Sequence, residues 1–321
     1  MKLKFGKLLA SIGLIAAVAP AVAVAQADYP NRAITIIVPY APGGTTDVVG
    51  RALAESLSRQ LGQPVVIENK PGAAGAMGVI DMMNAKPDGY RLTMAPVGIF
   101  RQPYLQKTRY DPIRDLTYIA SFLTYDFAVT VKADSPFKTI KEFVDFAKKN
   151  PGEIDYGTPG RFTGNQVVLA ALGKKEGTQF THVPYKGDSD ATAALMGGHT
   201  KAAVVTNSIL AHVQSGAVRV LATADKERNP AFKDVPTLVE SGYDVIVPSP
   251  LGIAGPANLP QEIVDKLDQA VKKSLEDPSV KQAMDNFGVR TYYMDSKTYT
   301  DFAKTTFAAE KDIIGTLGLE D

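Results

Sequence analysis

The sequence contains no cysteine and only three histidines, His182, His199 and His212. Without cysteine there is no disulfide framework, no thiol nucleophile and no cysteine for a lipid anchor. The histidines show no metal-ligand spacing, so we expect neither a metal site nor a cofactor. No G-x-S-x-G elbow occurs either, so a hydrolase would lack its nucleophile and base. We therefore predict a protein that is not an enzyme. A secreted hydrolase is the alternative that measurable turnover would reveal.

Neither sign of charge is in excess, because 35 basic residues face 34 acidic ones. No clustered basic face is visible, which argues against a nucleic-acid partner. Beyond residue 27 no apolar run reaches the length of a membrane span. The chain length of 321 residues suits two α/β domains, and we expect a monomer.

The first 27 residues are typical of a secretory signal peptide. Lys2, Lys4 and Lys7 precede a short apolar core from residue 8 to residue 18. Ala25-Gln26-Ala27 fits the small-x-small cleavage rule, so we place cleavage after Ala27. A retained anchor is the alternative, but the apolar segment is short for a span. Removing three lysines leaves 32 basic and 34 acidic residues, a net charge of −2.

The stretch from Ile34 to Ala95 organises the chain. Apolar runs at 34–38, 65–67 and 90–95 alternate with helical patterns at about 49–61 and 74–84. Glycine-rich loops, 39–47 and 69–75, follow the first two strands and precede the helices. This order predicts a parallel sheet with both loops at its carboxyl edge, where open α/β sheets bind ligands.

Both loops offer the free N–H groups of a helix N-terminus, and their glycines allow close approach of a ligand. Thr45 and Thr46 add hydroxyl groups. We interpret the pair as a cradle for a small anion, most simply a carboxylate; an ordinary turn is the alternative for one loop alone. The spacing fits neither a P-loop nor a dinucleotide fingerprint. Asp47 would repel an anion, so we expect it to cap N–H groups, or to reach a ligand through water.

A second series of strands and helices follows. Strand material at 118–131, 154–157, 180–184, 202–205 and 218–223 alternates with helical patterns, including a capping box from Thr139 to Glu142. The tail predicts a strand at 251–254 and helices at 259–276, 277–287 and 296–315. Two such series indicate two lobes with a cleft between them.

The loop from Thr158 to Asn165 can reach the cleft from the second lobe through hydroxyl and amide groups. Arg161 is the strong cation of these loops, and either solvent or a ligand can be its partner. Phe162 can stack on an aromatic ligand or plug the lobe. If this loop does not bind the ligand, residues 186–188 and Asn207 are the next candidates.

These segments resemble the substrate-binding proteins of tripartite tricarboxylate transporters, the periplasmic Bug (Bordetella uptake gene) receptors. The resemblance rests on YPNRAITIIVPYAPGGTTD, VIENKPGAAGAMG, KPDGY, IDYGTPG, HVPYKG, ALMGGH, VRVLATADKER, VPTLVESGY and GPANLP, in this order along nearly the whole chain. Members of the family often carry serine at the position of Thr158 and a histidine near Asn165, so the identity of the ligand stays open.

The resemblance implies an α/β fold of the type II periplasmic binding protein class, with two α/β lobes and a ligand cleft. We expect residues 28–126 and 247–321 in lobe 1, and residues 127–246 in lobe 2. The implied function is capture of a di-, tri- or aromatic carboxylate and its delivery to membrane transporter subunits; a ligand sensor for a membrane signalling partner is the alternative. The expected ligand-binding residues are Tyr40, Gly44, Thr45, Thr46, Asp47, Ala73, Ala74, Gly75, Thr158, Gly160, Phe162, Thr163, Asn165 and Asn207.

Overall fold

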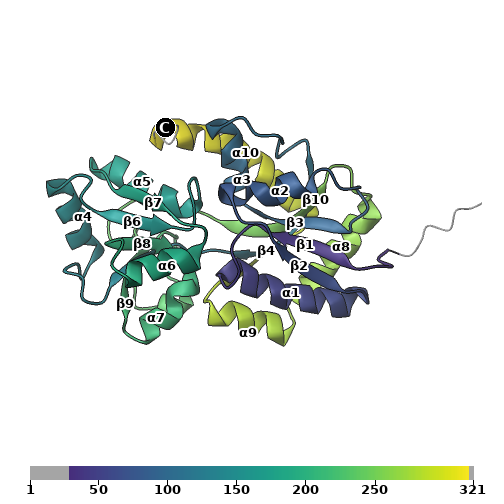
Figure 1. The fold of residues 1–321 in the computed structure, drawn as a ribbon, viewed down its shortest axis with the longest axis horizontal. Helices are drawn as coiled ribbons and strands as arrows, with labels where there is room; N and C mark the ends of the chain where they lie inside the picture. The colour runs from purple at the N-terminus through teal and green to yellow at the C-terminus, as the bar shows by residue number, and fades with distance from the viewer. Residues whose placement is uncertain (1–28, 318–321) are drawn as a thin grey trace, which may run out of the picture.

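The computed structural model describes residues 29–317 and contains two β-sheets (Figure 1). The strand order is β11-β4-β10-β3-β1-β2 in the six-stranded sheet and β7-β6-β8-β5-β9 in the five-stranded sheet. We call the six-stranded sheet with its helices lobe 1 and the five-stranded sheet with its helices lobe 2. The predicted signal peptide lies outside the described residues.

Lobe 1 is built from two separate parts of the chain. Its strands are β1 (Ile34–Val38), β2 (Val65–Asn69), β3 (Arg91–Pro96), β4 (Leu116–Thr124), β10 (Pro250–Pro256) and β11 (Arg290–Met294). Its helices are α1 (Thr45–Leu61), the short 3-10 turn η1 (Ala73–Gly75), α2 (Ala76–Met82), α3 (Gly98–Leu105), α8 (Gln261–Ser274), α9 (Pro278–Asn286) and α10 (Ser296–Leu317).

The β1-β2-β3 part of this sheet is parallel, as the sequence predicts, whereas β10, β4 and β11 pair in an antiparallel manner. Helix α1 packs against α8 and α9, and α10 packs against α3 and β4. The strands are therefore covered by helices, and the loops after β1, β2 and β3 meet at one edge of the sheet.

Lobe 2 repeats the α/β pattern. Its strands are β5 (Ala128–Lys132), β6 (Asp155–Thr158), β7 (Thr181–Pro184), β8 (Ala202–Val205) and β9 (Val218–Thr223). Its helices are α4 (Ile140–Lys149), α5 (Gly164–Glu176), α6 (Asp188–Met196), η2 (Asn207–Ile209), α7 (Leu210–Gln214) and η3 (Pro230–Phe232). The capping box predicted at the start of α4 is present, with Glu142 N donating to Thr139 Oγ1 at 3.2 Å.

The chain passes between the sheets in the segments that follow β4 and precede β10. The boundaries that we expect near residues 126 and 247 fall in these segments, and they stay a proposal. A hydrophobic core runs through the same place, because Tyr125, Phe127 and Val247 are buried in one cluster with residues of both sheets. The two lobes therefore share packed side chains near the crossings.

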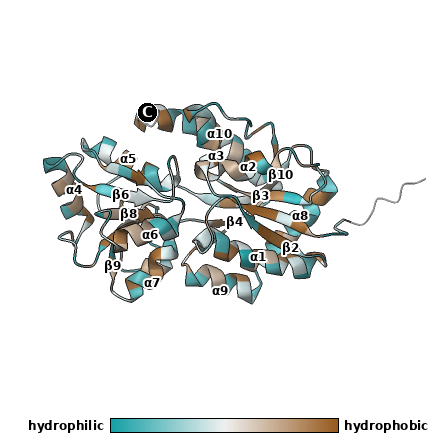
Figure 2. Cartoon of the chain, in the orientation of Figure 1, coloured by the Kyte–Doolittle hydropathy of each residue, from teal (hydrophilic) through white to brown (hydrophobic). Residues whose placement is uncertain are grey.

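Helices of both lobes carry hydrophobic and hydrophilic residues on different faces (Figure 2). In α4 the buried residues Ile140, Phe143, Val144 and Ala147 recur at the three- and four-residue spacing of one helix face. Between residues 29 and 317 we find no helix with the length and apolar character that a membrane crossing requires.

Candidate functional site

The loop after β1 lies where the lobes meet. Gly44 is the N-cap residue of α1, and the loop is held by Asp47, whose carboxylate accepts from Gly43 N at 3.0 Å and from Asn69 Nδ2 at 2.9 Å. Burial alone would raise the pKa of Asp47, but these bonds and Arg51, 2.8 Å away, hold it below its usual value. Asp47 thus anchors the loop to the end of β2.

The loop after β2 is strained. Four consecutive residues, Gly72 to Gly75, have positive φ angles, and two of them are alanines, with φ of 48° at Ala73 and 50° at Ala74. Alanine in this conformation costs of order 1 kcal/mol or more and persists only where the surroundings enforce it. Such strain gathers at binding sites, so the loop has the character that we expect of a ligand cradle.

A third loop, after β3, was not anticipated from the sequence. Pro96, Val97 and Gly98 line a space between the lobes that the loop after β1 also lines. Gly98 packs so closely on the preceding loop that a Cβ would lie 2.3 Å from the Ala74 carbonyl oxygen. The signal was present in the sequence, because Pro96-Val97-Gly98 is a third strand-to-helix junction at the same edge of a parallel sheet.

Lobe 2 contributes the loop after β6. Thr158 is fully buried and is bonded within its own lobe, to the Gly160 carbonyl at 2.9 Å and to His182 Nε2 at 2.6 Å. Thr163, the N-cap residue of α5, donates to the same carbonyl at 3.0 Å. Asn165 Nδ2 donates to the Val204 carbonyl at 3.0 Å. These bonds fix the shape of the loop before any ligand arrives.

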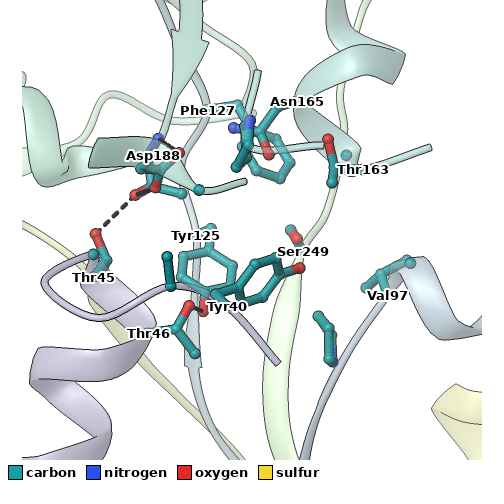
Figure 3. Close-up of a pocket in the computed structure, with 18 residues that line it drawn as sticks. Tyr40, Thr45, Thr46, Val97, Tyr125, Phe127, Thr163, Asn165, Asp188 and Ser249 are labelled. Atoms are coloured by element: carbon teal, nitrogen blue, oxygen red, sulfur yellow. Dashed lines mark hydrogen bonds between the residues drawn. The ribbon is translucent and has the colours of Figure 1, made fainter. Parts of the chain in front are cut away.

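A chain of hydroxyl groups crosses from one lobe to the other (Figure 3). Thr45 Oγ1, at the start of α1, lies 2.8 Å from Thr206 Oγ1 in lobe 2. The Thr206 hydroxyl in turn donates to the carboxylate of Asp188, the first residue of α6. Because the Thr206 proton is used on Asp188, Thr45 is the donor of the first bond.

Between the lobes lies a small, partly open space, which we call the inner cavity (Figure 3). Its volume is about 30 Å³. Since roughly 10–15 Å³ holds one water, it has room for about two. Thr46 Oγ1 lies 2.5 Å from the Tyr125 hydroxyl at its floor. It is lined by Tyr40, Ala41, Gly44, Thr45, Thr46, Pro96, Val97, Gly98, Tyr125, Phe127, Pro159, Thr163, Gly164, Asn165, Gly187, Asp188, Thr206 and Ser249.

A larger space of about 610 Å³, the outer pocket, adjoins it and shares Tyr40 and Pro159 with the inner cavity. Its walls include residues 71–74 from lobe 1 and residues 159–162 and 184–186 from lobe 2. Gln102 also lines it, and the buried Nε2 of this side chain has no hydrogen-bond partner among the described residues. A buried amide donor without a partner is costly, so a ligand acceptor would satisfy it.

The structure brings most of the predicted site residues together. Tyr40, Gly44, Thr45, Thr46, Thr163 and Asn165 line the inner cavity, and Tyr40, Ala73, Ala74, Gly160 and Phe162 line the outer pocket. Asp47, Gly75, Thr158 and Asn207 line neither space and instead shape the loops. Asn207, for example, donates to the Gly288 carbonyl of lobe 1 at 2.6 Å.

The three histidines lie apart from the two spaces, and the described residues contain no group of three or more potential metal ligands. Burial, with a smaller contribution from Arg161, lowers the pKa of His182 to about 4. His182 is therefore neutral near pH 7 and serves as a hydrogen-bond partner of Thr158.

Comparison with solved structures shows where this architecture occurs. A structure described as "Structure of a periplasmic transporter" matches with a TM-score of 0.86 at 34% identity, covering 91% of this chain and 99% of that one. MatC from Rhodopseudomonas palustris with bound malate matches at 0.83 and 26%, covering 89% and 100%. R. palustris Rpa4515 with adipate matches at 0.85 and 25%, covering 91% and 99%.

Sequence comparison points the same way. A Cupriavidus necator protein described as "UPF0065 protein in gbd 5'region" is 41% identical over 311 residues, which cover 97% of this chain and 94% of that protein. The model of the tripartite tricarboxylate transporter family receptor, TctC, matches residues 49–319. The chain therefore belongs to the tripartite tricarboxylate transporter receptor family, as its motifs indicate.

Proposed function

We propose that this protein is a periplasmic solute-binding protein that captures a small organic carboxylate and delivers it to a tripartite tricarboxylate-type membrane transporter. The observation that carries the proposal is the pair of adjoining spaces between the lobes, lined by loops from both sheets. Two solved relatives with the same architecture hold malate and adipate. Both of these ligands carry carboxylates, and the donors that line this cleft suit the same group.

A carboxylate that loses its water must find N–H and O–H donors. The inner cavity supplies the N-terminal end of α1 at Gly44 and the hydroxyl groups of Thr45, Thr46 and Thr163, which would exchange their present partners for the ligand. The outer pocket adds the side chains of Arg161, Lys186 and Gln102. We infer that the anion enters by the cationic outer pocket and is held by hydroxyl and backbone donors, partly through ordered water.

Capture then follows from a change in the separation of the lobes. The inner cavity is too small for an organic acid as it stands, so a ligand that reaches Thr45 must enter while the lobes are apart. Contacts from both lobes favour the closed state once the ligand is in place. We expect the ligand to be returned chemically unchanged, because the family is one of receptors.

A thermal-shift screen of the purified protein with malate, adipate, citrate and benzoate tests the capture. At least one acid should raise the melting temperature, since a ligand at 100 times its Kd adds about 2.7 kcal/mol to the stability of the folded state. Titration calorimetry then gives the affinity. If no acid in the panel shifts the melting temperature at millimolar concentration, the proposal fails.

A matched pair of threonines tests the location. Thr163→Val removes a hydroxyl from the inner cavity and should weaken binding of the acid by about tenfold. Thr139→Val removes the N-cap hydroxyl of α4, outside the cleft, and should lower the melting temperature without changing affinity. If both variants bind the acid with equal affinity, the ligand does not bind at Thr163.

Delivery and location need tests of their own. Export should remove residues 1–27, so mass spectrometry of protein from the periplasm should find a chain that begins at Asp28. Membrane vesicles that contain the transporter subunits should take up labelled acid only when the loaded protein is added. Scattering measurements on the exported protein should give the mass of a monomer.

A further inference from the structure

A carboxylate faces the inner cavity. Asp188 is 8% exposed and lies beside Thr45 and Thr206, on the lobe 2 side of the space (Figure 3). The Thr206 hydroxyl donates to Oδ2, and the Thr206 N–H lies 3.4 Å from Oδ1. A buried negative charge at this place opposes the binding of an anion, so Asp188 must affect which ligand the cleft accepts.

No positive charge balances Asp188 within this space. Among the described residues that line the inner cavity there is no lysine, arginine or histidine. Burial raises the pKa of Asp188 to about 6, and hydrogen bonds from Thr206 and Ser208 oppose the rise. The carboxylate is therefore mostly ionised at pH 7.5, and a second anion brought against it would be repelled at close range in a poorly solvated space.

The outer pocket has the opposite character. Arg161 and Lys186 line it, together with the amide of Gln102. The cleft is thus polarised along its length, with positive charge and donors at the outer end and a carboxylate at the inner end. A ligand that matches this arrangement places its carboxylate on the donors at Gly44 and Thr163 and towards the outer pocket, and directs a proton-bearing group at Asp188.

We propose that Asp188 selects acids that carry a hydrogen-bond donor, a hydroxyl or an ammonium group, next to a carboxylate, over the same acids without that donor. The inference rests on the proposed function and narrows its substrate class to hydroxy acids and amino acids. A donor satisfies the free acceptor capacity of the buried carboxylate, and an ammonium group also neutralises its charge. A plain acid leaves Asp188 without a new partner and pays the cost of desolvating it.

Matched sets of acids test the preference at pH 7.5, because the members of a set differ only at the carbon beside one carboxylate. The sets are succinate, malate and aspartate; glutarate, 2-hydroxyglutarate and glutamate; propionate, lactate and alanine; and 3-phenylpropionate, phenyllactate and phenylalanine. Within any set that binds the wild type, a donor-bearing member should bind at least about tenfold more tightly than the plain acid. Whether the hydroxy or the amino member is tighter identifies the donor.

Two variants and one control tie the preference to the residue. Asp188→Asn removes the charge and keeps an oxygen that can accept from Thr206, and Asp188→Ser is the second variant should the first unfold. Either should bring the ratio of affinities to within about threefold. The control, Asp190→Asn, changes an exposed acid on the same turn of α6 and should leave the ratio as it is.

The outcomes separate this inference from the function on which it rests. If folded wild-type protein binds none of the sets and none of the screening panel, the carboxylate receptor itself is contradicted. If acids bind but the plain member of each binding set is as tight as its donor-bearing analogues, only the role of Asp188 is overturned. The role is overturned equally if the ratio survives in both Asp188 variants.

Discussion

Gly75 carries two constraints that only glycine meets. Its φ of 103° disfavours any side chain, and a Cβ would lie 2.4 Å from Pro96 Cγ. The residue lines neither the inner cavity nor the outer pocket, so we expect its replacement to act first on the fold. This expectation differs from the close approach to a ligand that the glycine-rich loop predicts, which stays a prediction.

We predict that Gly75→Ala lowers the free energy of unfolding by about 2 to 5 kcal/mol, the sum of a backbone cost and an overpacking cost. Gly242→Ala is the control, because Gly242 has a φ of 90° but no atom within 4 Å of its would-be Cβ. It should show only the backbone cost of about 1 to 2 kcal/mol. Urea unfolding of both variants measures the difference, and equal losses would refute the packing argument.

His182 links the second-lobe loop to pH. Its pKa of about 4 in the folded protein is below the 6.5 of an exposed histidine, so the unfolded chain takes up the proton first. Stability from this group is present above about pH 6.5 and is lost as the pH falls towards 4, by at most about 3 kcal/mol. His182→Gln should flatten urea stability between these pH values, whereas His199→Gln, at an exposed site, should retain the wild-type slope.

At the scale of elements, helix α10 is tied to the body by a buried ion pair. Arg101 Nε donates to Glu310 Oε2 at 2.7 Å, and Arg101 Nη1 donates to the Phe162 carbonyl of lobe 2 at 2.8 Å. Both charged residues are about 2% exposed or less. The same guanidinium group thus holds α3, α10 and a cleft loop together.

Removing one partner of this pair leaves a buried charge without compensation. We predict that Glu310→Gln lowers the free energy of unfolding by about 3 to 5 kcal/mol. Asp301→Asn, which breaks the exposed pair with Lys297 on the same helix, should barely change the melting temperature. Calorimetry compares them, and similar melting temperatures for the two variants would show that the buried pair is not needed.

Most elements follow from local pattern. The predicted strands at 202–205 and 218–223 have the observed bounds, and the last helix begins at Ser296 as predicted. Strand material at 118–131 is in fact β4 and β5, in different sheets, because a continuously buried run gives no sign of where the chain changes partner. The sequence pattern does not predict α3, because this helix is short and contains Pro103. It does not predict β11 either, because β11 is a short strand at the edge of the sheet.

The candidate site follows less completely. The glycine-rich loops identify Gly44, Thr45 and Thr46, since a strand-to-helix junction at a parallel sheet edge is a local signal. Asp188 and Thr206 enter the cavity only because two sheets from different parts of the chain approach each other. No spacing along the sequence encodes that approach, so their place beside Thr45 had to come from the structure.

At the scale of the whole molecule, polar contacts join the lobes without a ligand. Thr45 meets Thr206, Arg101 meets the Phe162 carbonyl, and Asn207 meets the Gly288 carbonyl. Arg290 of β11 pairs with Asp126 at 2.7 Å and with Asp225, close to both crossing segments. These contacts therefore stabilise the closed arrangement of the lobes even without a ligand. We expect the loss of any one of them to shift the balance towards an open form.

Thr45→Val keeps the shape of the side chain and removes the hydroxyl that donates across the cleft. Losing one neutral hydrogen bond should raise the open-to-closed ratio by about two- to tenfold. Thr46→Val is the control, because its hydroxyl bonds to Tyr125, at the end of its own sheet. Small-angle scattering without ligand should show a larger radius of gyration for Thr45→Val alone. If the curves of Thr45→Val and the wild type are indistinguishable, the Thr45–Thr206 hydrogen bond does not hold the lobes closed.

The small volume of the inner cavity, about 30 Å³, bears on the rate at which a ligand is released. Any acid seated against Thr45 and Asp188 is enclosed by both sheets, so it leaves no faster than the sheets separate. The opening step therefore limits the residence time, and a ligand that stabilises the closed state more strongly slows this step further. Under the proposed function, handover to a membrane partner would require that partner to accelerate the opening, for example by binding the separated lobes more tightly than the closed ones.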